Sequence, residues 1–206
     1  MSTRRSIGYI VLDTVTPKAI TSSTNAAPIE ITKASHWYVT WDKILITGHV
    51  TNTAANWMWT VTKTWTNTLT LDWSTGNGVW WATWIMMTQP KMLYVDDFRT
   101  CTLSVDTASS ANFTMKTAWS TGKSTTSWDY PNFWASQSAT NQYDFVEMVD
   151  LQDWAYIDWD TWFVPTWTDD HKQYEVNTNW LKWLTVYCTA WTAWSITVKA
   201  TLYDNL

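Results

Sequence analysis

The side chains best suited to chemistry are three histidines, His36, His49 and His171. Histidine acts as a metal ligand or a general base, and both roles need partner groups at short range. No HExxH motif or paired spacing of histidines occurs. Asp169, Asp170 and His171 are consecutive, so their side chains point in different directions in a strand or turn. We therefore predict no histidine-based metal or acid–base site, and we expect His36 to lie in a turn.

A group of aspartates in the last third of the chain is the second candidate for a binding site. Carboxylate oxygens are the ligands that calcium prefers. In the EF-hand pattern, Asp158 and Asp160 would match the first two ligand positions, but Trp162 stands at the third and no glutamate follows at the required spacing. Loop aspartates commonly hydrogen-bond the backbone of their own turn. We interpret the whole group as turn residues and predict no bound cation: Asp153, Asp158, Asp160, Asp169 and Asp170.

Nucleophilic residues also lack the context that catalysis requires. Cys101 and Cys188 are far apart without CxxC spacing, so neither a zinc site nor a disulfide framework is indicated, and we expect both to be buried. Residues 118–122 lack the strand-to-helix context of a nucleophile elbow. Gly76-Asn77-Gly78 is interpreted as a turn, because no helix pattern follows it. We assign no catalytic, cofactor-binding or metal residues and expect no enzyme and no cofactor; a hydrolase is the least favoured alternative.

Composition and charge exclude several function classes. The formal net charge is -5 and the sequence pI is about 5.0, which argues against nucleic-acid binding because phosphates require a basic face. Charged residues make up 15% and hydrophobic residues 46%, yet no run approaches the ~18 apolar residues of a membrane span. Residues 1–13 lack the apolar region and cleavage site of a secretory signal. We expect no nucleic-acid partner, no membrane insertion and no export by the general secretory route.

Secondary-structure patterns predict an all-β protein. Threonine is abundant and apolar residues alternate with polar ones, which favours strands. The predicted strands cover residues 7–12, 28–32, 43–48, 58–64, 67–71, 101–106, 112–117, 144–151, 173–176, 181–189 and 195–203. We expect an N-terminal strand and linker at 1–25, a small β-barrel or meander at 26–88, and a β-sandwich of jelly-roll-like type at 92–206. Pro90 marks the boundary between the two domains.

Tryptophan usage is anomalous. The chain has 20 tryptophans and 5 glycines, whereas glycine alone is normally about 7% of residues. The tryptophans fall where turns call for glycine, as in Asp72-Trp73-Ser74, Asn56-Trp57 and Asn179-Trp180. Asn-Gly and Asp-Gly are strong hairpin signals because those turns need a positive φ, which only glycine reaches without a Cβ penalty.

A non-standard genetic code explains this pattern. The opal codon encodes tryptophan in some codes and glycine in others, so we hypothesise that most of these letters stand for glycine. Trp59 and Trp183 lie within strand-like alternation and are interpreted as true indoles. The alternative is that all 20 tryptophans are real and form an aromatic binding surface.

With glycine at those positions, part of the chain resembles a small β domain found in phage virion proteins, which is similar to the FCCH-type domain of ubiquitin-activating enzymes. His36-Trp37 and Thr40-Trp41-Asp42 then match HG..TGD. The match continues through residues 27–31, 46–48, 52–62 and 67–78. Residues 144–161 and 174–183 resemble, more loosely, the C-terminal β domain of tailed-phage structural proteins.

The resemblance implies a non-enzymatic virion component: a head fibre, decoration or tail-associated protein. It further implies assembly with other virion proteins and with copies of itself, preferably as a trimer, and it implies no ubiquitin chemistry. A carbohydrate-binding module, free-standing or as a receptor-binding tip for a host-surface glycan, is the alternative. Its physical basis would be true indoles stacking on sugar rings.

Overall fold

The computed structural model describes residues 6–56, 58–78, 84–107, 113–120, 142–143, 148–152, 154–157, 171–179, 181–191 and 195–204. Strands supply nearly all regular structure in these ranges, and the one helix is a single 3-10 turn, η1 (Thr53–Ala55). The predicted all-β class is therefore confirmed. No helix among these residues is long and apolar enough to cross a membrane.

The chain divides into two compact units. The small unit contains residues 16–89 and 189–191, and the large unit contains residues 1–15, 90–188 and 192–206. After the small unit, the large unit resumes at Pro90. The N-terminal boundary differs, because residues 6–15 form a strand of the large unit and the small unit begins ten residues before the expected position 26.

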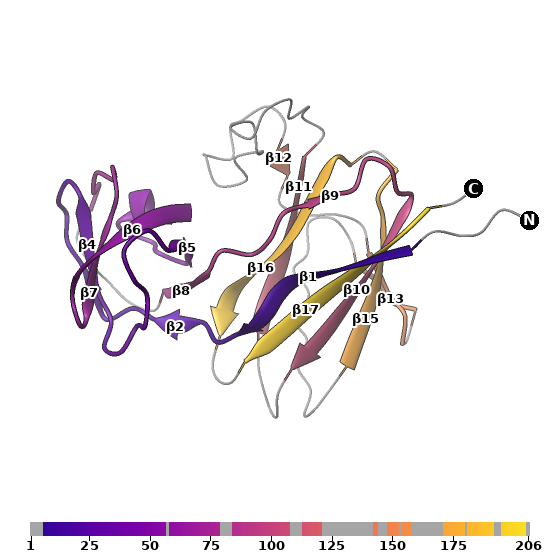
Figure 1. The fold of residues 1–206 in the computed structure, drawn as a ribbon, viewed down its shortest axis with the longest axis horizontal. Coiled ribbons are helices and arrows are strands. Elements are labelled where there is room, and N and C mark those ends of the chain that lie inside the picture. The colour runs from indigo at the N-terminus through magenta and orange to yellow at the C-terminus, as the bar shows by residue number, and fades with distance from the viewer. Residues whose placement is uncertain are drawn as a thin grey trace, which may run out of the picture. The chain divides into compact units, whose positions relative to one another are not determined.

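The small unit is a curled antiparallel sheet around its own core (Figure 1). Alternation of apolar and polar residues directs one face of each strand inward, as in β4, where Ile29 and Ile31 are buried. The core also contains Leu69, Leu71 and Val61. In spatial order the strands are β2 (Lys18–Ala19), β8 (Ile85–Thr88), β5 (Lys43–Thr47), β6 (Met58–Trp65), β7 (Thr68–Leu71), β4 (Ile29–Thr32) and β3 (Ser22–Ser23).

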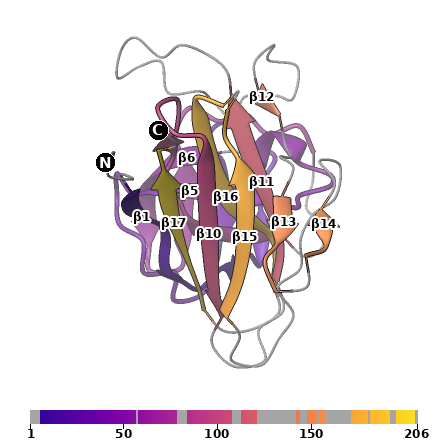
Figure 2. The same ribbon diagram turned by 90° about the vertical axis from the view of Figure 1, so that its right-hand side faces the viewer.

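The large unit is a β-sandwich of two sheets (Figure 2). Alternate residues of the six-stranded sheet are buried, including Leu103, Val198 and Ala200, whereas residues 184–188 of the four-stranded sheet are all buried. The six-stranded sheet has the order β1 (Ser6–Val15), β17 (Ile196–Tyr203), β10 (Thr100–Thr107), β15 (His171–Asn177), β13 (Met148–Asp150) and β14 (Tyr156–Ile157). The four-stranded sheet has the order β12 (Gln142–Tyr143), β11 (Phe113–Ser120), β16 (Trp183–Trp191) and β9 (Leu93–Tyr94).

Two segments differ from their sequence-based interpretation. Residues 21–27, expected as a linker, are tied to the sheet, because Thr21 N donates to Thr32 O at 2.8 Å and Thr24 N donates to Glu30 O at 2.9 Å. Strand β8 was not predicted, yet it lies between β2 and β5. Its continuous apolar run, Ile85 to Met87, shows no alternation because the strand is buried on both faces.

Candidate functional site

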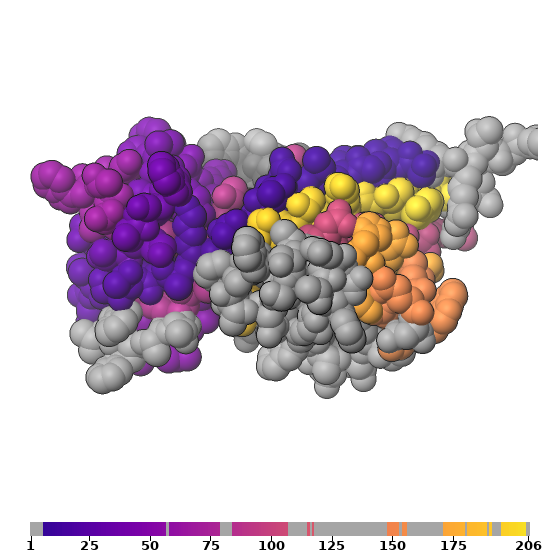
Figure 3. Space-filling model, turned by 90° about the horizontal axis from the view of Figure 1, so that it is seen from below, coloured from indigo at the N-terminus to yellow at the C-terminus, as the bar shows by residue number. Residues whose placement is uncertain are grey.

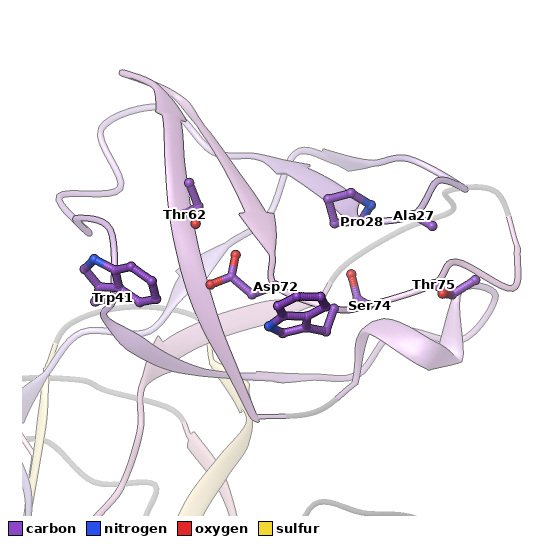
Figure 4. Close-up of a pocket in the computed structure, with 8 residues that line it drawn as sticks. Ala27, Pro28, Trp41, Thr62, Asp72, Ser74 and Thr75 are labelled. Atoms are coloured by element: carbon purple, nitrogen blue, oxygen red, sulfur yellow. The ribbon is translucent and has the colours of Figure 1, made fainter.

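A groove lies on the surface of the small unit (Figure 4). Its cavity volume is about 570 Å³. Two turns, the segment just before β4 and part of β6 border it, with these lining residues: Ala27, Pro28, Trp41, Thr62, Asp72, Trp73, Ser74 and Thr75. Sequence analysis assigned no site here, so this groove is a finding of the tertiary structure.

The first turn places Trp41 at the groove. Asp42 closes this turn, since its Oδ2 accepts a hydrogen bond from Val39 N at 2.9 Å and its own N donates to Val39 O at 3.1 Å. The backbone is also paired with β6, where Trp41 N donates to Val61 O at 2.8 Å. The indole of Trp41 is exposed at the surface.

The second turn follows β7 and carries Asp72 and Trp73. Buried Ser74 holds it, because its Oγ donates to Leu71 O at 2.6 Å and accepts from Ile29 N at 2.8 Å. Trp73 is 98% exposed, so its ring packs against nothing. In the view of Figure 4, the side chain of Asp72 lies between those of Trp41 and Ser74.

This arrangement has the elements of a sugar-binding surface. Indole faces stack on apolar faces of sugar rings, and a carboxylate or hydroxyl fixes the ring through hydrogen bonds. Trp41 and Trp73 supply the faces, while Asp72, Thr62 and Thr75 supply the polar groups. Such chemistry requires that positions 41 and 73 carry indoles in the mature protein.

Backbone conformation at the tryptophans bears on that requirement. Six described residues other than glycine have a positive φ, and four of them are tryptophans: Trp37 (66°), Trp41 (79°), Trp73 (64°) and Trp154 (60°). Left-handed geometry is rare for bulky residues and routine for glycine. All four indoles are exposed, so no packing compensates for the strain.

Two other tryptophans occupy a different environment. Trp59 lies in β6, packs against the small-unit core and donates from Nε1 to Ala55 O at 3.1 Å. Trp183 begins β16, and its ring meets that of Tyr94 edge-on with centroids 5.2 Å apart. These are the two positions that the sequence interpreted as true indoles.

Trp84 departs from the sequence interpretation, which placed it among the recoded positions. Its side chain is buried in the small-unit core against His49. The indole Nε1–H has no hydrogen-bond acceptor among the described residues, and a buried unpaired donor costs roughly 1–3 kcal/mol.

The three histidines do not converge on one site. His36 and His49 are buried in the small unit, and each accepts a backbone N–H at Nδ1: His36 from Tyr38 at 3.1 Å and His49 from Asn52 at 3.1 Å. Burial lowers the pKa of both rings, and at His36 the nearby charges of Lys63 and Lys18 lower the pKa further. Both are therefore neutral structural residues, and His36 lies just before the turn at 39–42.

His171 lies on the outer face of the six-stranded sheet. Its Nδ1 contacts Asp106, and Asp106 also pairs with Lys199 at 3.5 Å. The histidine and Lys199 are exposed, so this is a solvated polar cluster in which Asp106 and Lys199 form the ion pair. No hollow among the described residues is associated with it.

The two cysteines and the group of aspartates are the remaining candidates from the sequence. Cys101 and Cys188 are both free and buried, and burial raises the pKa of the Cys101 thiol to about 12, so it is an unreactive packing residue. Asp153, Asp158, Asp160, Asp169 and Asp170 lie outside the described residues. Within the described ranges, no three metal-binding side chains come together.

No family model matches the chain, and no curated protein matches it either.

Proposed function

We propose that this chain is a non-enzymatic structural component of a phage virion: a head fibre, decoration or tail-associated protein that acts by protein–protein assembly. One observation carries the proposal. Trp37, Trp41 and Trp73 have the backbone geometry of glycine, and these are positions where the resemblance to the virion β domain requires glycine.

The turn at 36–42 makes this argument most directly. The HG..TGD pattern needs glycine at positions 37 and 41, where the φ angles are 66° and 79°. The aspartate of the pattern, Asp42, closes the turn through Val39 N. Glycine at both positions would form the same turn without strain, which supports both the non-standard code and the resemblance.

Weakly charged, threonine-rich strands suit an assembly role. Such a protein binds by shape and by pairing of backbone groups at sheet edges, and an oligomer covers surface that a monomer exposes. The proposed partners are other virion proteins and further copies of this chain, in the virion, with no nucleic-acid or membrane partner.

Mass spectrometry on purified phage particles tests the proposal. Cleavage after lysine yields peptide 34–43, which contains positions 37 and 41, and peptide 44–63, which contains positions 57 and 59. We expect glycine at 37, 41 and 57 and tryptophan at 59, so peptide 44–63 carries its own control. Absence of the chain from particles while it accumulates in infected cells would contradict a virion role, and tryptophan at 37 and 41 would remove its main support.

The groove favours a second candidate, a carbohydrate-binding module. If positions 41 and 73 carry indoles, we expect Trp41→Ala and Trp73→Ala each to weaken glycan binding by about tenfold in calorimetry. Trp65→Ala is the matched control, because Trp65 is an exposed indole of the same unit outside the groove. Equal losses at all three positions, or no binding on a glycan array, would exclude this candidate.

A further inference from the structure

Strand β1 is the one long strand at a sheet edge in the described part of the chain. It has 10 residues, whereas the other edge strands, β14, β12, β9, β2 and β3, have two residues each. In Figure 3, β1 runs beside β17 along the border of the six-stranded sheet. An edge strand presents unpaired N–H and C=O groups to any chain that can add to it.

The free part of this edge is its first half. Ser6 to Ile10 pair with β17 in unbroken register, and register shifts follow after Ile10 and after Leu12. The carbonyl of Val11 accepts a hydrogen bond from Lys91 N at 3.0 Å, so another segment occupies the edge there. Regular pairing with an added strand is therefore available at residues 6–10.

Side chains along this stretch leave apolar surface uncovered. Tyr9 is 41% exposed and Ile10 is 40% exposed. They lie on opposite faces of the sheet, since Tyr9 is paired with buried Ala200 and Ile10 with exposed Lys199. No charged residue or proline occurs between Ser6 and Leu12, although proteins normally protect free edges with such residues.

We propose that β1 pairs with β1 of a second copy of this chain, antiparallel about a two-fold axis at Gly8. This inference rests on the proposed assembly role and names the surface through which copies associate. Ser6 then lies opposite Ile10 of the second copy, and Ile7 opposite its Tyr9. This pairing covers the exposed side chains of Tyr9 and Ile10, and one continuous sheet runs through the dimer.

The lengths of the edge strands indicate which strand pairs with β1. A ring such as a trimer would pair β1 with a different edge of the next copy, and every other described edge strand is two residues long. Among the described edge strands, β1 of another copy is the one that matches the five free residues. An axis at Tyr9 would place Ile7 opposite Val11, whose carbonyl is already bonded to Lys91. An axis at Gly8 keeps the whole pairing within the regular stretch.

Cross-linking at the axis tests the geometry. A side chain at Gly8 meets no other atom within 4 Å, so Gly8→Cys fits the fold. Two directly opposite residues of an antiparallel pair have Cβ atoms about 4.5–5.5 Å apart, close to disulfide range. We expect Gly8→Cys to form a disulfide-linked dimer under mild oxidation. Glu175→Cys is the control, since it is exposed on β15 inside the same sheet, and the native cysteines are buried.

Sedimentation equilibrium from about 1 µM to 1 mM measures the association without a cross-link. We expect a reversible dimer whose dissociation constant rises about tenfold or more in Ile10→Lys. Val50→Lys, an exposed loop position of the small unit, should leave it unchanged. Hydrogen exchange at amides 6–10 of the unmodified chain should slow as its concentration rises.

A monomer throughout this range with no Gly8→Cys cross-link would overturn the two-fold pairing and leave the edge to a different chain. A dimer or larger oligomer that Ile10→Lys does not weaken would also overturn it. Neither result bears on whether the chain is found in phage particles. Absence from particles alongside a β1 dimer would refute the virion role alone.

Discussion

The imidazole ring of His49 lies against the indole of Trp84, with ring centroids 3.9 Å apart, inside the small unit. Backbone N–H groups of Asn52 and Thr51 point at Nδ1, and Nε2 lies 3.2 Å from Ser23 Oγ. A ring that accepts N–H donors at Nδ1 and is shielded from water has no means of stabilising a second proton. His36 is in the same position, with Tyr38 N donating to its Nδ1.

Acid should therefore destabilise the small unit before its carboxylates titrate. The pKa of both His36 and His49 is lowered, mainly by burial, from an ordinary value of 6.5. A lowered pKa means that the unfolded chain takes up protons first, so stability is complete above pH 6.5 and is lost as the pH falls below it. Each histidine contributes a slope of at most about 1.4 kcal/mol per pH unit, in the range between its folded and unfolded pKa.

Urea unfolding at pH 7.5, 6.5, 5.5 and 5.0 measures this slope. His49→Gln should reduce this slope by up to one proton. A free energy of unfolding that stays constant between pH 7.5 and 5.0 would contradict the assignment of both buried rings as neutral.

Replacing an indole by glycine should have opposite effects at two positions. Trp73 has a φ of 64° and an exposed ring, so Trp73→Gly should stabilise the chain by about 1 kcal/mol. Trp59 packs on the core and donates to Ala55 O, so Trp59→Gly should cost about 2 kcal/mol or more. Denaturant midpoints measure both variants, and a destabilising Trp73→Gly would argue for a true indole at that position.

Ser74→Ala should destabilise the turn that borders the groove. The hydroxyl is the acceptor for Ile29 N, which is buried, and its loss leaves that N–H unpaired at a cost of about 1–3 kcal/mol. Thr75→Ala is the matched control, because Thr75 is the exposed next residue of the same turn. Urea unfolding measures the free energy of unfolding of both variants. Similar values for Ser74→Ala and Thr75→Ala would show that the Ser74 hydrogen bond does not contribute to stability.

Two glycines should respond differently to an added methyl group. At Gly78 a Cβ would lie 2.4 Å from Thr51 O, so Gly78→Ala forces the backbone apart and should cost about 1–3 kcal/mol. At Gly8 nothing lies within 4 Å, so Gly8→Ala should change stability by less than about 0.5 kcal/mol. Thermal unfolding of the two variants side by side measures the difference, and equal melting temperatures would contradict the close approach of residues 51 and 78.

Local pattern was sufficient for the fold class and for most of the strands. Alternation of apolar and polar residues identified β4, β6 and β10. Trp37, Trp41 and Trp73 stand where the turn sequence calls for glycine, which predicted their positive φ angles. Such signals depend only on neighbouring residues, because side-chain period and turn geometry are local properties of the backbone.

The groove of the small unit and the free edge of β1 arise only from the tertiary structure. Asp72 and Trp41 are 31 residues apart, and their approach follows from the pairing of β6 with both β5 and β7. Strand β1 joins the large unit because it pairs with β17 from the other end of the chain. The sequence by itself determined most of the longer strands and several of the turns. Which strands become neighbours depends on burying apolar faces that lie far apart in the chain, and no local pattern contains that information.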